Sequence, residues 1–469
     1  MRVAFVQNLW EELPGPVLLA EILERAGHEV RFFLAGRGFW RGLAGFRPEV
    51  LALSAVTGNH HWLLDFACRA KERLPGPPLT VMGGAHATFH PKVIDSPGVD
   101  AVCRGEGDIA FPRFLAGLSG GRMPEDTPNF WVKTPAGVVR NAPGLLVPDL
   151  DALPLPRRSA LYREHPFIRS SPFKKIVASR GCPFSCHFCH NAAYRKLVRG
   201  KGRFLRRRSV AHVLEEAAFL AACPGTKFID FHDDVFTLDR DWALTFAQAY
   251  GRRVGLPYGI NVHASHMDPG LAEALARSGC RSAAFGVEHG DAALRREVLG
   301  KTVTDEELLE CGRVLRKSGI WFRTYNIMGL PGETLGDAMK TVAFNQRIRP
   351  DYAWCTLALP LPGTRFAEIV AEKTGLSPEE AVENLSESWF SRSVVPGPDA
   401  ARLGNLQKFF GLLVRRPGLS PLIRRLVDLP ANPVFRAFFQ AHYGLSMLRR
   451  TRMGFPRLLR SYFKVRRHY

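Results

Sequence analysis

Three cysteines crowded into one short run constrain this chain more than any other feature. Cys182, Cys186 and Cys189 lie in the run GCPFSCHFC, which follows the apolar residues Ile176-Val177-Ala178 and a Ser179-Arg180-Gly181 turn. Thiolates this close together belong to one metal site. An iron-sulfur cluster of the four-iron type has four corners to ligate, so three cysteines leave one iron open to a ligand that is not protein.

Two other interpretations of the cysteine run are weaker. A zinc ion would take His187 or His190 as its fourth ligand, but no second CxxC or HxxxH follows at zinc-finger distance. A disulfide with a spare thiol requires an oxidising compartment, and nothing else in the sequence suggests one. We therefore expect a 4Fe-4S cluster held by the three cysteines.

The apolar strand, the glycine turn and the cysteine loop resemble the radical SAM (S-adenosylmethionine) enzymes. The signature of that family has this spacing and an aromatic residue before the third cysteine, here Phe188. In the family, the open iron binds the amino and carboxylate groups of SAM, and one electron cleaves a carbon-sulfur bond to give a 5′-deoxyadenosyl radical. The resemblance implies SAM as a cofactor with Phe188 beside it, and an external electron donor.

The other cysteines are scattered singly, so we expect small buried hydrophobic residues, a reducing cytoplasm and no second cluster. They are Cys68, Cys103, Cys223, Cys280, Cys311 and Cys355. The first apolar run breaks at Gln7-Asn8 without a cleavage site, which indicates a strand and not a signal peptide. No apolar run approaches the roughly 20 residues of a spanning helix. With 469 residues, the chain is long enough for two or three domains.

Residues 1–140 alternate short apolar runs with helical patterns. This alternation indicates an α/β fold with a doubly wound, Rossmann-like parallel sheet. Ligands of such sheets bind beyond the carboxyl ends of the strands. The expected strands begin at Val3, Glu29, Val50, Leu79 and Asp100.

The segments after three of these runs resemble the cobalamin-binding domain that precedes many radical SAM cores. The resemblance assigns cobalamin contacts to Ser54, Val56, Thr57, Gly83, Gly84, Gly105 and Glu106. The alternative is a Rossmann-like fold that has lost its ligand.

The loop after the first strand reads QNLWEELPG. It lacks the histidine that ligates cobalt from below in many cobalamin proteins, so the lower ligand does not come from there. We expect His60 and His61, after the third run, to be surface or helix-cap residues.

Residues 141–172 are proline-rich and non-periodic, which predicts a linker. From residue 173 to 375, six strand-like runs alternate with helical patterns. Six βα units suit a partial (β/α)6 TIM-type barrel, whose reactive positions lie at the carboxyl ends of the strands. The expected strands are Lys175–Ser179, Lys227–Phe231, Tyr258–Val262, Ser282–Val287, Phe322–Met328 and Tyr352–Leu359.

Polar or glycine residues follow these strands where a cofactor would lie. By the family resemblance, Asp233 and Asp234 lie near the SAM amino group and Glu288 near other polar groups of SAM. The GLPGET turn lies beside adenine, with Gly329, Pro331 and Gly332 in contact. For each single residue, the alternative is turn chemistry or a buried ion pair.

Basic residues gather in two places. Eight Lys and Arg side chains between Arg195 and Arg208 form a positive rim, which we expect to be a solvated loop. The alternative is attraction of an anionic substrate or a reductant.

Residues 376–469 are helical in pattern and strongly basic. The chain has a net charge of +20, and residues 401–469 contribute fifteen Lys or Arg side chains against the single acid Asp428. Aromatic and apolar residues interleave with these charges around Phe435–Phe439, Leu458-Leu459-Arg460 and Tyr462-Phe463-Lys464. Such a region suits contact with an anionic membrane, RNA binding, or a cap over the barrel mouth whose arginines face water.

Together these features predict a cytoplasmic, cobalamin-dependent radical SAM enzyme that methylates an unactivated carbon. The substrate would be a small molecule of lipid or isoprenoid type, with peripheral contact at the inner membrane face and no nucleic acid. A cobalamin-dependent cyclase or oxidoreductase is the near alternative, and a non-enzymatic cobalamin or redox-cluster module is the distant one. An RNA methylthiotransferase would normally carry a second cysteine triad, which this sequence lacks. The sequence does not identify a catalytic side chain.

Overall fold

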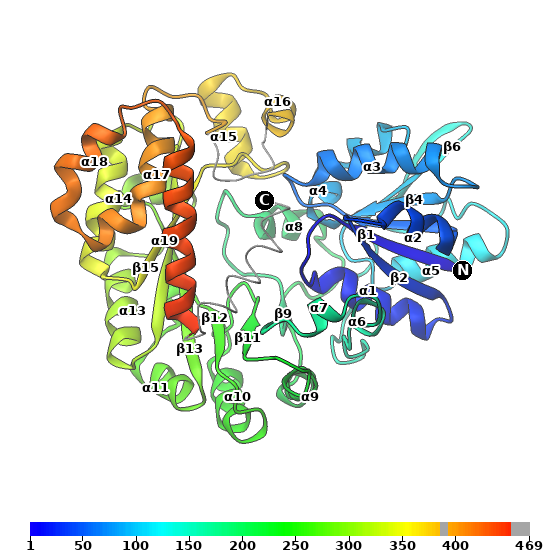
Figure 1. The fold of residues 1–469 in the computed structure, drawn as a ribbon, viewed down its shortest axis with the longest axis horizontal. Helices are drawn as coiled ribbons and strands as arrows, with labels where there is room; N and C mark the ends of the chain where they lie inside the picture. The colour runs from blue at the N-terminus through cyan, green and yellow to red at the C-terminus, as the bar shows by residue number, and fades with distance from the viewer. Residues whose placement is uncertain (385–392, 452–469) are drawn as a thin grey trace. The chain divides into compact units, whose positions relative to one another are not determined.

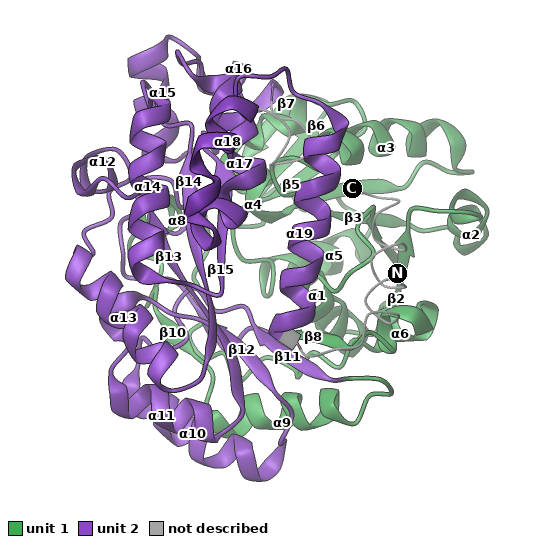
Figure 2. Ribbon diagram, turned by 60° about the vertical axis from the view of Figure 1, so that its left-hand side comes forward, with its two compact units in different colours: residues 1–175, 193–226, 463–469 green, residues 176–192, 227–462 purple. Residues whose placement is uncertain are grey.

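A computed structural model describes residues 1–384 and 393–451 of the chain. These residues form two compact units (Figure 2). The first contains residues 1–175 and 193–226, and the second contains residues 176–192 and the described residues from 227 onward. The predicted basic segments Leu458-Leu459-Arg460 and Tyr462-Phe463-Lys464 lie outside the described residues.

The first unit, in which Figure 1 labels β1, β2, β4 and β6, is built on a seven-stranded sheet with the order β2-β1-β3-β4-β5-β6-β7. Strands β1 to β5 run parallel, and their apolar residues are buried because helices cover both faces. The predicted doubly wound sheet is therefore confirmed. The strands are β1 (Arg2–Gln7), β2 (Glu29–Leu34), β3 (Val50–Ser54), β4 (Leu79–Gly83), β5 (Ala101–Cys103), β6 (Phe130–Thr134) and β7 (Gly137–Arg140). The helices are α1 (Pro14–Arg25), α2 (Phe39–Phe46), α3 (His60–Arg73), α4 (Gly84–Phe89), η1 (Pro91–Asp95) and α5 (Ala110–Ser119).

Strands β6 and β7 form an antiparallel hairpin at the sheet edge that the sequence did not predict. The hairpin turns at Gly137, which has a φ of +126° that other residues rarely adopt. The ring of Trp131 lies 5.0 Å from the guanidinium groups of both Arg104 and Arg140. Cation–π contacts thus hold the hairpin against β5.

The segment predicted as a linker contains two short helices, α6 (Ser159–Glu164) and α7 (Pro166–Arg169). A buried network of ion pairs anchors the middle of this segment. Arg158 Nη1 lies 2.5 Å from Glu216 Oε1, and Arg158 Nε lies 3.5 Å from Glu12 Oε2. Because an unpaired charge would be costly in this interior, the network fixes the path of the segment within the first unit.

The positive rim is only in part the solvated loop that we expected, because Lys196, Arg199 and Arg203 are exposed but other rim residues are not. It contains α8 (His190–Leu197) and β10 (Arg206–Arg207), and α9 (Val210–Ala221) follows it. Arg206 and Arg208 are buried. Arg206 Nη2 pairs with Glu106 Oε1 at 2.6 Å, and Arg208 Nη1 pairs with Glu216 Oε2 at 2.5 Å. Burial of these arginines is possible because each has a carboxylate partner.

A six-stranded sheet with the order β15-β14-β13-β12-β11-β8 carries the second unit, and β11 to β15 run parallel. The predicted partial (β/α)6 barrel is confirmed. The strands are β8 (Phe173–Ile176), β11 (Phe228–Phe231), β12 (Tyr258–Asn261), β13 (Cys280–Glu288), β14 (Trp321–Met328) and β15 (Tyr352–Leu357), with the two-residue β9 (Ser179–Arg180) outside this sheet. The helices are α10 (Arg240–Arg253), η2 (Ala264–His266), α11 (Pro269–Arg277), α12 (Ala292–Glu297), α13 (Asp305–Lys317), α14 (Leu335–Ile348), α15 (Arg365–Thr374) and α16 (Pro378–Glu383).

The C-terminal helices include one, α17, that packs against β15 (Figure 1). They are α17 (Ala400–Arg415), η3 (Pro417–Leu419), α18 (Ser420–Leu426) and α19 (Pro433–Thr451). Gln407 Nε2 on α17 donates a hydrogen bond to the Cys355 carbonyl at 2.8 Å, so an edge carbonyl of the sheet is satisfied. Helix α17 therefore packs against the last strand of the sheet and satisfies one of its carbonyls.

One of our alternatives was a cap over the barrel mouth whose arginines face water. Arg436 and Arg449 of α19 are exposed, but the end of this helix does not lie at the mouth. Arg450 is buried, and its Nη2 lies 2.5 Å from Asp230 Oδ1 while its Nε donates to Ser282 Oγ at 3.0 Å. Ser282 is near the start of β13, which is the end opposite the predicted cofactor positions. Among the described residues, no helix is long and apolar enough to cross a membrane.

Candidate cofactor sites

The three clustered cysteines lie on the loop between β9 and α8 and are partly buried. Asp233 holds the chain just before the loop, because its carboxylate accepts hydrogen bonds from the Ser179 hydroxyl and, at 3.2 Å, from the Ala178 amide. His187 holds the middle of the loop. Its amide donates to Leu299 O at 2.9 Å, and its Nδ1 lies 3.1 Å from Val298 O.

Both histidines considered as zinc ligands are engaged with the backbone. His187 contacts Val298 O through its ring, and His190 hydrogen bonds to the carbonyl of Pro362. In the described part of the chain, no three His, Cys, Asp or Glu side chains form a group that would hold a single metal ion. Thiolates of an iron-sulfur cluster bind different irons, so they do not need to converge on one point.

The chemistry of the three thiols fits a cluster. Burial raises the pKa of the Cys182 thiol to about 11 and that of Cys186 to about 12, and it also raises the pKa of Cys189. Soft thiolate ligands select iron-sulfur clusters, and the metal displaces the thiol protons when it binds. Asn191 Nδ2 lies 3.7 Å from Cys189 Sγ and is placed to donate to that sulfur.

The predicted SAM residues divide into accessible and supporting ones. Asp234 is exposed and hydrogen bonds to Asn191, whereas Asp233 is buried and holds the cysteine loop. Glu288, at the end of β13, has a φ of +64° and pairs with Lys301 Nζ at 2.9 Å. A Cβ on Gly286 would overlap the Glu288 carboxylate, so this ion pair requires a glycine there. Glu288 therefore takes part in a buried ion pair, as the alternative held.

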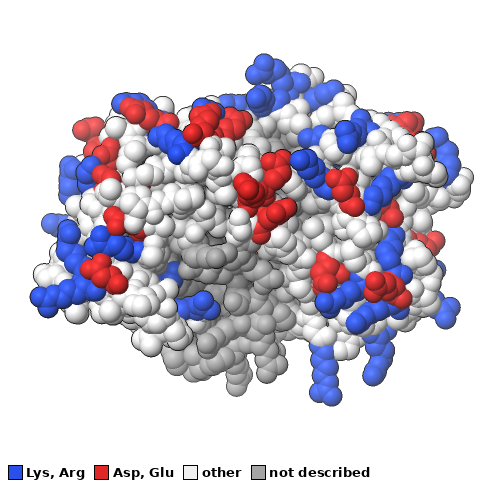
Figure 3. Space-filling model, turned by 90° about the horizontal axis from the view of Figure 1, so that it is seen from above, with Lys and Arg blue, Asp and Glu red and all other residues white. Residues whose placement is uncertain are grey.

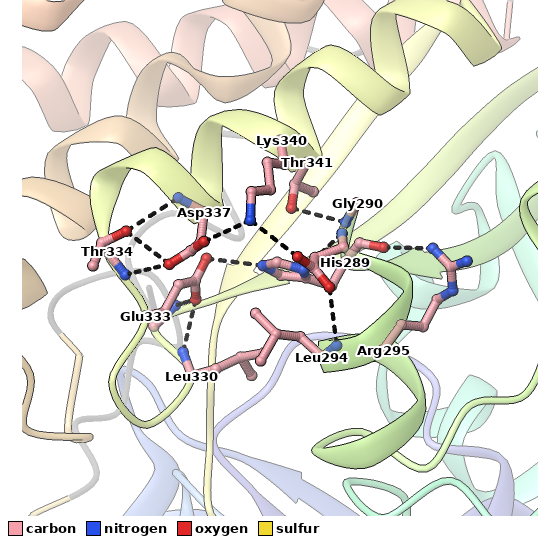
Figure 4. A network of polar contacts seen from close by, with 12 residues as sticks. His289, Gly290, Leu294, Arg295, Leu330, Glu333, Thr334, Asp337, Lys340 and Thr341 are labelled. Atoms are coloured by element: carbon pink, nitrogen blue, oxygen red, sulfur yellow. Dashed lines mark hydrogen bonds and ion pairs between the residues drawn. The ribbon is translucent and has the colours of Figure 1, made fainter.

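The GLPGET turn is built around the carboxylate of Glu333 (Figure 4). Glu333 Oε2 accepts hydrogen bonds from the amides of Gly329 at 2.7 Å and Leu330 at 2.8 Å. Its other oxygen lies 3.1 Å from His289 Nε2, and both side chains are wholly buried. His289 directly follows Glu288, so the pair joins the two segments predicted to contact SAM.

Sequence reasoning missed His289 and Glu333. The available signal was a polar residue directly after each glycine-containing motif, GVE-H and GLPG-E. Gly329 and Gly332 have φ values of +82° and +78°, which the tight turn requires. Pro331 is buried in this turn and Gly332 is exposed. Phe188 packs with Val298, Leu299 and Leu330 in one apolar cluster that joins the cysteine loop to the turn.

An apolar cavity lies at the carboxyl edge of the sheet in the first unit. Its lining includes Phe5, Leu19, Ser54, Gly83, Gly84 and Phe111. Gly84 has a φ of +91°, and a Cβ there would lie 2.5 Å from Ala55 O. The two loops are joined because Ala55 N donates to Gly83 O at 2.8 Å and His86 N donates to Ala55 O at 3.0 Å. Glycines and apolar side chains thus line a small cavity of about 60 Å³ at the edge where ligands of doubly wound sheets bind.

The predicted cobalamin residues fall into two groups, those at the cavity and those whose side chains bind other protein groups. Ser54, Gly83, Gly84 and Gly105 line the cavity, and Val56 beside them is 41% exposed. The other two side chains have protein partners. Thr57 is buried with its hydroxyl 3.0 Å from His86 Nδ1, and Glu106 is paired with Arg206.

Our expectation for His60 was wrong, because it is 3% exposed at the first residue of α3. Its ring stacks on His86 with centroids 3.9 Å apart. His61 is exposed as expected. Of the six scattered cysteines, all but the partly exposed Cys68 are buried as predicted.

Comparisons with known proteins agree with this geometry. Residues 11–115 match the B12 binding domain, and residues 176–344 match the radical SAM superfamily. An uncharacterized methyltransferase of Pyrococcus horikoshii is 29% identical over 326 residues, which is 69% of each chain. Hopanoid C-3 methylase of Methylococcus capsulatus is 30% identical over 297 residues, 61% of this chain and 50% of that protein.

A similar fold is known from a solved structure. The radical SAM methyltransferase TsrM of Kitasatospora setae, solved with tryptophan and a SAM analogue, superposes with a TM-score of 0.66. The match covers 79% of this chain and 76% of TsrM at 20% identity, which shows a shared fold. The chain is therefore a cobalamin-binding radical SAM enzyme, in which a B12 binding domain precedes the radical SAM domain and the cofactors are a 4Fe-4S cluster, SAM and cobalamin.

Proposed function

We propose that this enzyme replaces a hydrogen on an unactivated carbon of an apolar small molecule with a methyl group. The observation that carries the proposal is the presence in one chain of a thiol loop with three cysteines and a glycine-lined apolar cavity at the end of a doubly wound sheet. Methyltransferases among the matched proteins support methyl transfer over other outcomes of the same cofactors.

In this proposal, Cys182, Cys186 and Cys189 hold the cluster, and Ser54, Val56, Gly83, Gly84 and Gly105 lie along cobalamin. Phe188, Asp234, Glu288, Gly329, Pro331 and Gly332 contact SAM. Asp233, Thr57 and Glu106 do not contact the cofactors themselves, and their hydrogen bonds and ion pairs hold the loops that do. When bound, the cluster supplies an electron to SAM, and cobalamin carries the methyl group. The chain's own residues bind and orient the cofactors and exclude water.

The overall reaction balances with two molecules of SAM for each methyl group. A carbon–hydrogen bond of the substrate is broken and a carbon–methyl bond forms. One SAM yields methionine and 5′-deoxyadenosine, which receives the hydrogen, and the other yields S-adenosylhomocysteine. Two electrons enter from an external donor, so a reductant of low potential is a necessary partner.

The substrate class in this proposal is a lipid or isoprenoid. A relative named for hopanoid methylation supports this class. An apolar substrate also suits contact between the enzyme and a membrane surface, for which a specific face is argued below.

Anaerobic reconstitution tests the proposal. The protein is loaded with iron, sulfide and cobalamin, and it is given a chemical reductant, methyl-labelled SAM and a total lipid extract. We expect 5′-deoxyadenosine and S-adenosylhomocysteine in equal amounts, and a lipid heavier by one labelled methylene. 5′-Deoxyadenosine without label transfer would identify a cyclase or oxidoreductase instead, and absence of SAM cleavage would overturn both. Replacement of the three cysteines by Ala should abolish SAM cleavage and leave cobalamin bound.

A further inference from the structure

The connection from α18 into α19 presents apolar side chains to solvent. Leu422 is 54% exposed, Leu429 48% and Val434 70%. Other apolar residues of the same segment, Ile423 and Val427, are buried in the cluster that holds α14, α17 and α18 together. The segment is thus fixed to the protein by one set of apolar residues and offers a second set outward. We call residues 415–436 the corner.

The corner is strongly basic, and its charge is not neutralised from within. Its arginines at 415, 416, 424, 425 and 436 are all exposed. Asp428 is the single acid among residues 415–436. Its Oδ1 already accepts a hydrogen bond from Arg402 Nε at 2.7 Å. By contrast, Lys and Arg are interspersed with Asp and Glu over the face shown in Figure 3.

A groove rich in arginine continues the basic surface. It lies between α13 and α14, and its lining includes Arg313, Arg316, Arg347 and Arg349. Among the lining residues, Arg313 is paired with a carboxylate, that of Glu310 at 2.5 Å. Gln346, which also lines the groove, donates to Leu413 O at 3.1 Å, two residues before Arg415. This hydrogen bond places the groove beside the end of α17, where the corner begins.

We propose that this surface binds an anionic lipid membrane. Arginines attract the phosphate headgroups, and each cation near an anionic bilayer adds to the attraction. Leu422, Leu429 and Val434 then enter the boundary between headgroups and acyl chains, where exposed apolar side chains lose contact with water. The arginines alone, or the exposed aliphatic side chains alone, would not identify the partner. Together they match the anionic headgroups and the apolar acyl chains of a bilayer surface.

RNA would use the same cations but a different set of apolar groups. Binding of single strands relies on aromatic side chains that stack on bases. In the described part of the chain, the strongly exposed large apolar residues are all aliphatic. The surface therefore fits a lipid layer better than an RNA strand, and it would bring the enzyme to where apolar substrates reside.

Co-sedimentation of the full chain with vesicles tests this inference. One set of vesicles contains phosphatidylcholine alone, and the other contains phosphatidylglycerol as well. We expect binding to the anionic vesicles that weakens with added salt. Arg424→Glu with Arg425→Glu should lower the bound fraction about tenfold or more, and Leu422→Ser with Val434→Ser should lower it without changing the salt dependence.

Arg252→Glu with Arg253→Glu is the matched control, since both arginines are exposed on α10 and the change in net charge is identical. This variant should bind like the wild type. Equal loss in the control, equal binding to both kinds of vesicle, or no binding would overturn the inference. Displacement of the protein from vesicles by a short RNA at a lower concentration than by free phosphatidylglycerol would assign the surface to RNA. Because no cofactor is involved, these results are independent of methyl transfer.

Discussion

His289 Nε2 lies 3.1 Å from Glu333 Oε1, and neither side chain is exposed to solvent. The Asp291 amide donates to His289 Nδ1 at 3.0 Å, so the proton of the neutral ring is on Nε2 and points at Glu333. Glu333 in turn orders the amides of Gly329 and Leu330. One buried contact thus ties the end of β13 to the turn expected beside adenine.

Replacing His289 with Ala should weaken SAM binding more than cobalamin binding. The change leaves one oxygen of a buried carboxylate without its donor, which costs about 1–3 kcal/mol of unfolding free energy. Denaturant unfolding and SAM titration of the reconstituted protein measure the two effects. His289→Gln keeps an N–H donor and should recover part of both losses. Unchanged SAM affinity in His289→Ala would show that the contact does not position the turn.

Filling the cavity of the first unit should block cobalamin and spare SAM cleavage. Ser54 lines this cavity, so Ser54→Phe places a ring in the space that cobalamin would need. Ile109 is 55% exposed, and Ile109→Phe adds a ring of the same size at the surface. The cobalamin absorption bands after gel filtration should be lost in the first variant and kept in the second. Retained cobalamin in Ser54→Phe would contradict the site.

Much of the architecture was predictable because apolar periodicity reports burial within one strand or helix. The runs that became β1, β3 and β14 needed no tertiary information. The β6–β7 hairpin was missed because its strands are short and β7 has no buried residue. The sequence also contained no sign of which side chains pair when they are far apart along the chain. His289 and Glu333 are 44 residues apart, and Arg450 and Asp230 are 220 apart.

Position in a motif also does not reveal what a side chain touches. Thr57 and Glu106 lie in the expected cobalamin loops, but their side chains bind His86 and Arg206. His60 begins a helix, a place that is often exposed, yet it is buried because α3 packs its first turn against α4. Only the fold supplies these neighbours.

Acid should destabilise the protein partly through His60. Burial is the main reason that the pKa of His60 is lowered to about 4, and its Nδ1 accepts a hydrogen bond from the Gly58 amide at 3.1 Å, which requires a neutral ring. An unfolded histidine titrates near 6.5. Between pH 6.5 and about 4, His60 is therefore protonated in the unfolded chain and neutral in the folded protein. Stability from this group is complete above pH 6.5 and is lost as the pH falls through that window.

Denaturant unfolding at pH 7 and pH 5 measures this loss. The wild type should lose up to about 1.4 kcal/mol per pH unit more than His60→Gln, which cannot take up the proton. His61→Gln is the control, since His61 is exposed next to it and should behave like the wild type. Equal pH dependence of all three proteins would exclude His60 as an acid-sensitive group.

Gly300 should be required for the cluster although it is not a ligand. Its φ is +63°, and a Cβ there would overlap the ring of His187, whose backbone and ring hold the cysteine loop through Leu299 and Val298. Gly300→Ala therefore has to displace His187 and with it Cys186 and Cys189. We expect lower iron and sulfide content after reconstitution and a matching loss of 5′-deoxyadenosine formation.

Gly319→Ala separates this effect from backbone strain. Gly319 has a φ of +70°, so Ala suffers the same left-handed strain of roughly 1 kcal/mol, but nothing lies within 4 Å of the added methyl group. This variant should unfold slightly earlier and keep its full iron content. If both variants lose stability and neither loses iron, His187 does not position the cysteine loop. Loss of iron in Gly300→Ala alone would show that the cysteine loop depends on the close packing of the His187 ring against Gly300.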